Sequence, residues 1–376
     1  MEERYSFITD WYDSYASINR QYQLVFFPSD STCEMIDIKQ KRLFLRRSPS
    51  PVKLDEIFLG AVLNILSRQL KVVDFADDFT RSRLETRKQI TLALIKPDSA
   101  IAHIGEILNA IISEGLTIAK MRMLRLTLKE AERFYRMSSS QILFNDDIQY
   151  ISSGPLVAIE LVGENAIQRW ADILGPSDPA EARQVSPSSL RARFGTDQTH
   201  NVGHGSIGSE VAGREVEFFF KEGRGEILGS PTAEGCTLCI IKPDALKAGL
   251  SAKIIQDILS EGLEITGLGL YNVEKANAEE FYEVYKGVLH EYPDMVSLLT
   301  SGPSIAIALS GRNAQAQFRQ LCGPPDPEIA RHLRPHTLRA KYGKNKLENG
   351  VHCTDLPEDG PLEVEYFFKI LDNGNN

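Results

Sequence analysis

Apolar positions along this chain alternate between two spacings. Short apolar runs such as TLALI (91–95) and LVAIELVG (156–163) are typical of buried strands. Between them, IGEILNAIISEGL (104–116) places apolar residues three and four positions apart, which predicts a helix with one buried face that Gly115 is suited to end. The same reasoning predicts a strand at TIAKMRMLRL (117–126) and helices at LKEAERFYRM (128–137), NAIQRWADILG (165–175) and EVAGREVEF (210–218).

This order of elements occurs twice. TLALIKPD at 91–98 returns as TLCIIKPD at 237–244, and the offset of 146 drifts only to 148 over the whole unit. SEGL, SGP and LRA recur in step, and the second copy predicts a helix at 251–263, a strand at 263–273 and a helix at 277–289. A chain laid out this way is a tandem duplication, and its βαβ order predicts two α/β (α+β) domains of ferredoxin-like type.

The remaining segments bound these units. Residues 1–88 share no repeat with the rest and contain short strand-like runs separated by turn residues, which predicts a small β-rich domain. The segment KEGRGEILGSPTAEG (221–235) is Gly-rich and lacks apolar periodicity, as expected of a surface linker. The predicted domains are therefore 1–88, 89–222 and 236–372, with 223–235 as the linker.

Composition narrows the class of protein. Of 376 residues, 42% are hydrophobic and 25% charged, as in soluble globular proteins, and no apolar run is long enough to span a membrane. The acidic N-terminus lacks the features of a signal peptide, and five cysteines fit reduced thiols in the cytosol or nucleus. Cys236 and Cys239 form a CxxC, for which burial in a strand is favoured over zinc or redox chemistry.

The charge is unevenly distributed. The chain has a net charge of −9, with 14 basic and 13 acidic residues in positions 1–90 and a net charge of −10 in the remainder. An acidic body argues against nucleic acid as the main partner. The basic run KQKRLFLRR (39–47) is the local exception, and it suits either an acidic protein surface or a solvated hairpin.

Polar residues recur at matched places in the two units. In the first unit they are Lys96, Tyr135, Arg191, Asn201, His204 and Glu215, and in the second Lys242, Tyr282, Arg339, Asn349, His352 and Glu363. Lys and Arg bind phosphate oxygens through charge-assisted hydrogen bonds, and a neutral His is a competent nucleophile toward phosphorus. A Glu that accepts from the other ring nitrogen would fix the tautomer of the His.

Each of these features has a simpler interpretation when taken alone. A single Asn-x-x-His is nearly uninformative, and a Lys after a strand is usually a solvated end. His200 and His204, four positions apart, form a poor metal pair because they lie in a Gly-rich stretch rather than on a helix. The ordered combination of polar types is the stronger signal.

That combination resembles a known family. IKPD, SGP, LRxxFG and NxxHGS, in this order and across both units, are similar to the motifs of nucleoside diphosphate kinases. The resemblance implies ping-pong phosphoryl transfer through a phosphohistidine, with ATP and nucleoside diphosphates as substrates and Mg²⁺ bound with the nucleotide. It implies catalytic roles for His204, Glu215 and His352, and nucleotide-binding roles for Lys96, Tyr135, Arg191, Asn201, Lys242, Arg319, Arg339 and Asn349.

The chain departs from the family pattern at several positions. Gln141 and Leu143 replace an Arg and a base-stacking Phe, and Ala171 replaces a phosphate-binding Arg that the second unit keeps as Arg319. The second unit also lacks the Arg-Pro-Phe stretch. It places Cys353 and Thr354 where the first has Gly205 and Ser206, and Tyr282 matches Tyr135 only after a one-residue insertion. The pattern predicts an eroded second site and weak activity at most in the first.

The N-terminal region contains FITDWYDSYASINRQYQLVFFPSDSTCEMID (7–37) and LDEIFLGAVLNILSRQLKVVDFADDFT (54–80). These segments resemble the PH-like DM-ten domain of ciliary axonemal proteins. This resemblance implies tubulin, doublet microtubules and other axonemal proteins as partners, and a place in the cytoplasm, cytoskeleton and axoneme or at centrosomes. Two hypotheses follow: a structural microtubule-associated protein with two kinase folds, or a working phosphotransferase carried to the cilium. Nuclease activity has no separate support in the sequence.

Overall fold

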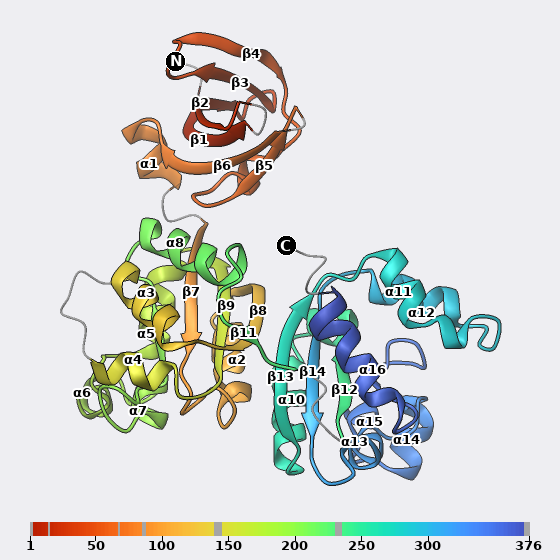
Figure 1. Ribbon diagram of the computed structural model, residues 1–376. Coiled ribbons are helices and arrows are strands. Elements are labelled where there is room, and N and C mark those ends of the chain that lie inside the picture. The colour runs from red at the N-terminus through yellow and green to blue at the C-terminus, as the bar shows by residue number, and fades with distance from the viewer. Residues whose placement is uncertain are drawn as a thin grey trace.

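Three folded parts make up the chain (Figure 1). The computed structural model describes residues 3–13, 16–66, 68–84, 88–138, 145–229 and 235–371. None of the described helices is long and apolar enough to cross a membrane.

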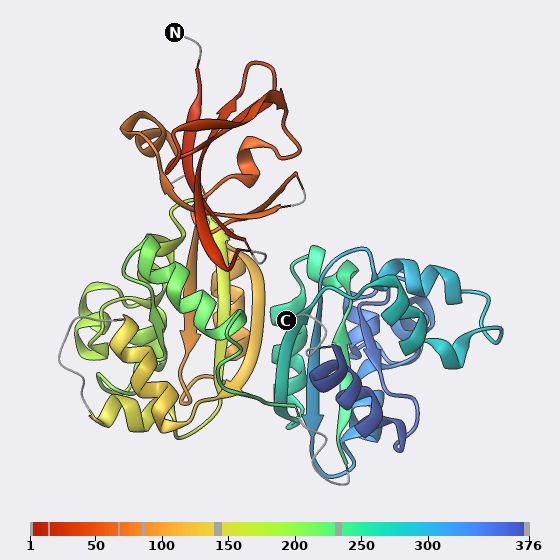
Figure 2. The same ribbon diagram turned by 45° about the horizontal axis from the view of Figure 1, so that its top comes forward.

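The N-terminal part is a six-stranded antiparallel sheet in the order β4-β3-β2-β1-β6-β5, as the β-rich prediction required. It has β1 (Tyr5–Asp13), β2 (Ile18–Phe27), β3 (Thr32–Asp37), β4 (Arg42–Pro49), η1 (Leu54–Glu56), β5 (Val62–Ile65), β6 (Arg68–Phe75) and α1 (Asp78–Leu84). The sheet curls on itself (Figure 2). Its buried core includes Phe7, Leu24, Met35 and Val72. A core of its own makes this part a separate domain.

The first repeat unit is an antiparallel sheet in the order β10-β7-β9-β8 with helices on both faces. Its elements are β7 (Gln89–Ile95), α2 (Ile104–Ser113), β8 (Thr117–Arg125), α3 (Leu128–Ser138), α4 (Asn145–Ile151), β9 (Leu156–Gly163), α5 (Ala166–Leu174), α6 (Pro179–Val185), α7 (Leu190–Phe194), β10 (Gly203–Gly205) and α8 (Ser209–Phe220). The strands and helices predicted from apolar spacing are confirmed.

The second unit repeats this arrangement in the order β13-β14-β12-β15. It has β12 (Thr237–Ile241), α9 (Pro243–Lys247), α10 (Ser251–Ser260), β13 (Glu264–Tyr271), α11 (Lys275–Phe281), η2 (Glu283–Tyr285), α12 (Tyr292–Leu299), β14 (Ser304–Ser310), α13 (Ala314–Cys322), α14 (Pro327–Leu333), α15 (Leu338–Tyr342), β15 (Val351–Cys353), α16 (Asp359–Glu365) and a π-helical turn, η3 (Tyr366–Leu371).

The helix predicted over 277–289 is wrong in its C-terminal half. The α-helix ends at Phe281 and is followed by the short 3₁₀ turn η2. Gly287 has a φ of 77°, a left-handed conformation that no α-helix continues through. Tyr285 also turns away to donate a hydrogen bond to the carboxylate of Asp355, 70 positions along the chain. Tertiary contacts thus override a helical apolar pattern here.

The two units form an intramolecular pseudo-dimer, as we expect of a tandem pair. Their sheets join through an antiparallel contact between β8 and β13, in which Arg122 lies opposite Gly269. These residues are 147 positions apart, the same offset as Ser113 and Ser260, so Arg122 meets its own repeat counterpart. Such self-pairing places an approximate two-fold axis at this point.

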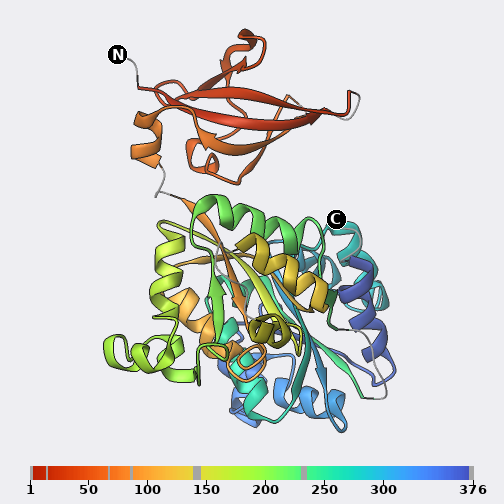
Figure 3. The ribbon, with the colours of Figure 1, turned by 60° about the vertical axis from the view of Figure 1, so that its left-hand side comes forward.

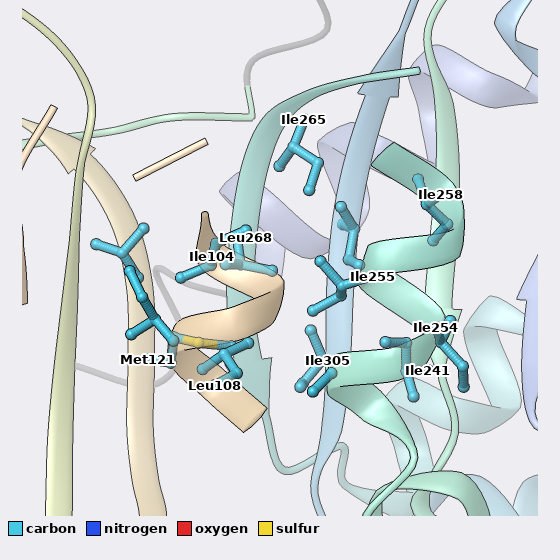
Figure 4. Packing of buried hydrophobic residues seen from close by; sticks show 14 of the residues in the cluster. Ile104, Leu108, Met121, Ile241, Ile254, Ile255, Ile258, Ile265, Leu268 and Ile305 are labelled. Carbon is cyan, nitrogen blue, oxygen red and sulfur yellow. The ribbon is translucent and has the colours of Figure 1, made fainter. Parts of the chain in front are cut away.

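A shared apolar core reinforces the junction. Helix α2 lies against α10, its counterpart (Figure 4). Ile104 and Leu108 of α2 belong to the same buried cluster as Ile255 of α10 and Leu268 of β13. Burial of apolar surface from both units makes the interface part of the folded core rather than a loose contact.

The linker is more ordered than its composition indicates. Glu226 and Ile227 form β11, which pairs antiparallel with β8, so this part of the predicted surface connection belongs to the sheet. Gly229 lies so close to Gly267 that a Cβ on Gly267 would be 2.5 Å from the Gly229 Cα. Residues 230–234 of the linker lie outside the described residues.

The N-terminal part sits beside one end of the first unit (Figure 3). Lys71 on β6 donates to Glu217 on α8 at 2.8 Å. The side chains of Lys71 and Glu217 are 36% and 30% exposed, so solvent screens this ion pair and its stabilisation is modest.

Candidate active site

The short strand β10 carries His204 at the edge of the first unit's sheet. It pairs antiparallel with β7, which places His204 opposite Leu94. Gly205 is required on this strand, because a Cβ there would lie 2.7 Å from the Cδ1 of Trp170. Trp170 in turn donates from Nε1 to the backbone oxygen of His204 at 3.1 Å. The strand is therefore fixed against α5 on the side away from the imidazole.

Glu215 holds the imidazole in place. His204 Nε2 lies 2.8 Å from Glu215 Oε1, and Ser206 donates from Oγ to Glu215 Oε2 at 2.5 Å. Burial alone would raise the pKa of Glu215, but the hydrogen bonds from His204 and Ser206 outweigh it and lower that pKa. An ionised Glu215 accepts from Nε2–H, so the neutral ring keeps its lone pair on Nδ1, the nitrogen available for nucleophilic attack.

An aromatic wall lies beside the imidazole of His204. Phe134 on α3 packs edge-on against His204, with ring centroids 5.3 Å apart. Tyr135 follows it and contacts the Phe134 ring at 5.7 Å. Burial, with the nearby Asp147 carboxylate as a second cause, raises the pKa of Tyr135, so this phenol stays protonated and able to donate.

Lys96 is buried rather than solvated. It follows β7, and its Nζ donates to Asn201 Oδ1 at 2.8 Å and to the backbone oxygen of Thr199 at 2.9 Å. Burial lowers the pKa of Lys96 to about 8. The fold thus places two predicted nucleotide-binding residues, Lys96 and Asn201, in direct contact, although they are 105 positions apart in the sequence.

Arg191 organises the backbone around the histidine. Its guanidinium donates to the carbonyl oxygens of Gly175 at 2.6 Å, Gly203 at 2.7 Å and Asn201 at 3.2 Å. Burial lowers the pKa of Arg191 to about 10. These bonds tie α7, which carries Arg191, to the segment entering β10. The predicted phosphate contact of Arg191 stays a prediction.

The second unit reproduces most of this arrangement. His352 on β15 has its Nε2 3.1 Å from Glu363 Oε2, and Thr354 donates to the same carboxylate oxygen at 2.8 Å. Lys242 donates to Asn349 Oδ1 at 2.7 Å, matching Lys96 and Asn201. The structure therefore brings the predicted Lys–Asn and His–Glu pairs together in both units.

The second site differs from the first in the exposure of its histidine but matches it in the aromatic neighbour and in the arginine contacts. The His352 side chain is 8% exposed, compared with 19% for His204. Phe281 packs edge-on against His352 at 5.2 Å, which supports Tyr282, the next residue, as the counterpart of Tyr135. Arg339 donates to the carbonyl oxygens of Gly323 and Val351 as Arg191 does to its own loop.

Arg319 differs between the units more than any other predicted residue. It forms an ion pair with Asp355, and Asp355 also accepts from Tyr285 at 2.5 Å. The counterparts of Arg319 and Asp355 in the first unit are Ala171 and Ile207, both at an offset of 148. The first unit therefore lacks this ion pair as a whole, and Arg319 is engaged by protein rather than by solvent alone.

The sequence did not predict Asp355 as part of the second site. It also did not predict that Ser206 and Thr354 would donate to the carboxylates of Glu215 and Glu363. Their signal is the matched spacing of nine residues from each hydroxyl to its Glu, which recurs in both units. The substitutions at Gln141 and Leu143 fall outside the described residues, so the wall that a nucleobase would stack on is not described.

The residues considered as metal ligands have other surroundings in the fold. Cys236 and Cys239 are buried free thiols, with Cys239 in β12 as expected. His200 Nδ1 lies 2.9 Å from Asp197 Oδ2, while His204 faces Glu215. Within residues 3–371, apart from the undescribed gaps, no group of three or more His, Cys, Asp or Glu could hold a metal ion. Mg²⁺ fits this donor set only as an ion held mainly by nucleotide phosphates and water, which is its common mode of binding.

Comparison with known proteins defines the class. Residues 89–224 and 235–372 match the family described as nucleoside diphosphate kinase, and residues 1–86 match one described as the nucleoside diphosphate kinase 7 N-terminal PH domain. The chain belongs to the nucleoside diphosphate kinase family, whose members use Mg²⁺ with the nucleotide.

Two relatives align with almost the whole chain, and a solved structure aligns with about one third of it. The chain is 48% identical over 373 residues to proteins named nucleoside diphosphate kinase homolog 7 from Rattus norvegicus and Mus musculus, covering 99% of this chain and 94% of each relative. A solved structure of the Aquifex aeolicus nucleoside diphosphate kinase is 34% identical and covers 37% of this chain and 97% of its own, with a TM-score of 0.35.

Proposed function

We propose that the chain is a structural component of ciliary doublet microtubules, built on two nucleoside diphosphate kinase folds, with weak phosphotransfer at most. The observation that carries this proposal is the uneven state of the two sites. The first unit keeps His204 and Glu215 but has Ala171 in place of an Arg, and the second has Arg319 engaged by Asp355. Losing one charged phosphate contact costs about 2 kcal/mol of transition-state binding, which is tens-fold in rate.

The N-terminal domain supports the location in the axoneme. This domain resembles a domain of axonemal proteins. In addition, part of its basic run is exposed on the edge strand β4. Arg42 and Arg46 are exposed there, whereas Arg47 is paired with Asp30 at 2.7 Å. Exposed cations on an edge strand suit the acidic surface of tubulin.

Microtubule pelleting tests this proposal. The full chain should co-sediment with microtubules, and the double variant Arg42→Glu, Arg46→Glu should bind roughly tenfold more weakly. Each exposed charge contact contributes up to about 1 kcal/mol, and 1.4 kcal/mol is tenfold in affinity. The control Lys129→Glu, Lys247→Glu makes the same charge change on exposed positions of the two kinase units. Equal weakening by both variants would show that the effect depends on net charge and not on β4. Absence of binding by the full chain would contradict microtubules as the partner.

The second candidate function is an active nucleoside diphosphate kinase that transfers the γ-phosphate of ATP to nucleoside diphosphates through phospho-His204. The His204–Glu215 pair is the observation that favours it, because the pair leaves Nδ1 free to attack phosphorus. In this candidate, Lys96, Tyr135, Arg191 and Asn201 would bind the nucleotide, and Lys242, Arg319, Arg339 and Asn349 would do so in the second unit.

Binding of ATP to the first site should be coupled to proton uptake near pH 8. Burial lowers the pKa of Lys96 to about 8, so about half of this amine is neutral there. A nearby triphosphate favours the charged form and raises that pKa, so binding should take up as much as about half a proton. Calorimetry of Mg·ATP binding to the His204→Ala chain, in buffers of different ionisation enthalpy, measures this uptake without phosphoryl transfer.

The matched control is Lys96→Arg in the same background. An arginine stays charged at this pH, so binding should persist while the proton uptake disappears. Uptake that survives Lys96→Arg would assign the effect to another group, such as Lys242, whose pKa burial also lowers to about 8.

A further inference from the structure

Three of the five cysteines converge in the second unit. Cys239, Cys322 and Cys353 are free, buried and part of one core cluster. Cys353 on β15 lies directly opposite Cys239 on β12. Arg339 donates from Nη2 to the sulfur of Cys353 at 3.6 Å, so a guanidinium adjoins the group of thiols.

The repeat shows that two of these positions touch. The counterparts of Cys353 and Cys322 in the first unit are Gly205 and Leu174, both at an offset of 148. A Cβ built on Gly205 would lie 3.5 Å from the Cδ1 of Leu174. The second unit has a thiol at both positions, and α13, which Cys322 ends, contacts β15, which carries Cys353. One pair of neighbouring apolar positions has thus become a pair of neighbouring thiols.

The surroundings make the two thiols unequal. The hydrogen bond from Cys322 and the positive charge of Arg339 lower the pKa of Cys353 against the opposing effect of burial. Burial raises the pKa of Cys322. Such a difference in acidity between two neighbouring thiols favours Cys353 as the attacking sulfur and Cys322 as the resolving one.

We propose that Cys322 and Cys353 form a reversible disulfide in response to a peroxide. The Cys353 thiolate attacks one oxygen of hydrogen peroxide, giving a sulfenic acid on Cys353 and hydroxide, which takes a proton to become water. The Cys322 sulfur then attacks the Cys353 sulfur, losing its proton as the sulfenic oxygen leaves as a second water. The two thiols lose two electrons in total, and the peroxide is reduced to two waters.

This disulfide would link two parts of the second site. Cys322 ends α13, the helix that carries Arg319, and Cys353 follows His352 on β15. The bond would fix the helix end to the strand and would convert the thiol that Arg339 faces into a disulfide sulfur. The proposal needs neither phosphoryl transfer nor microtubule binding, so it stands apart from both candidate functions.

The test is oxidation of the full native chain with one equivalent of hydrogen peroxide, followed by acid quenching, alkylation of the remaining thiols and peptide mapping. The expected result is a fall from five alkylated cysteines to three, with a Cys322–Cys353 peptide that dithiothreitol releases. Replacement by the first unit's residues, Cys322→Leu, should abolish the linkage and leave a Cys353 sulfenic acid that dimedone traps. The Cys33→Ala and Cys236→Ala controls should keep the linkage.

Other outcomes overturn the proposal. Five free thiols after treatment, a bond from Cys353 to Cys239 instead, or linkage that forms only in denaturant would each do so. Thermal melting of Cys322→Leu and of Cys353→Gly shows whether each variant is folded. The replacing residues, Leu and Gly, occupy the matching positions 174 and 205 of the first unit. At least one variant should therefore be folded and keep the experiment decisive.

Discussion

The His204→Ala chain should carry no acid-labile phosphate after incubation with labelled Mg·ATP, whereas the His352→Ala chain should keep most of the label found on the unaltered protein. His204 presents Nδ1 from a strand whose next residues are Gly205 and Ser206, and its ring is the more exposed of the two. Removing the nucleophile removes the covalent intermediate itself, so the loss should be complete rather than partial.

His200→Ala is the matched control for this experiment. His200 lies four positions before His204 and is held by Asp197, away from Glu215. Its replacement should leave the label unchanged. Retained label without His204, or equal loss from the His204 and His352 variants, would contradict the assignment of the reactive residue to the first unit. No label on the unaltered chain would favour a purely structural protein.

Deletion of residues 1–88 should abolish or strongly weaken incorporation into ciliary doublets, while both kinase units still fold. The N-terminal sheet has its own core, and the two units share another through α2 and α10. Among described contacts, the ion pair between Lys71 and Glu217 is about one-third exposed and adds little stability. Removing the domain therefore costs the units little, but it removes the exposed basic strand β4.

Imaging in ciliated cells that lack the native protein measures this effect, with circular dichroism of the truncated chain as the check on folding. The His204→Ala full-length chain is the control and should incorporate normally, because scaffolding does not need phosphoryl transfer. Normal localisation of the truncated chain together with failure of the His204 variant would replace the structural proposal with the enzymatic one.

Much of the fold could be predicted from the sequence because its signals are local. Apolar spacing identified β7, α2 and β9, and the repeat transferred the same elements to the second unit. The end of α11 could not be predicted, because the contact of Tyr285 with Asp355 that accompanies it is long-range. The strand β11 was missed for the same reason. Its two residues pair with β8 only because the folded linker passes beside that strand.

The candidate site divides in a similar way. The pairing of His204 with Glu215 follows from residue type and spacing, and the structure brings the two together. The surroundings of Lys96 and Arg191 do not follow, because a sequence shows neither the burial of an amine nor the carbonyl oxygens that a folded loop presents. Their donors are aimed at protein groups, which no spacing rule indicates.

The antiparallel junction in which Arg122 faces Gly269 also bears on how the two sites diverge. In a dimer of identical chains, every substitution occurs twice, once in each site and on both sides of the interface. Here the halves are encoded separately, so Gly205 and Cys353 or Ala171 and Arg319 can differ without a matching change. The tether also keeps the halves at a fixed effective concentration, so dilution cannot separate them. One copy is therefore free to lose or exchange its chemistry while its neighbour and their common framework persist.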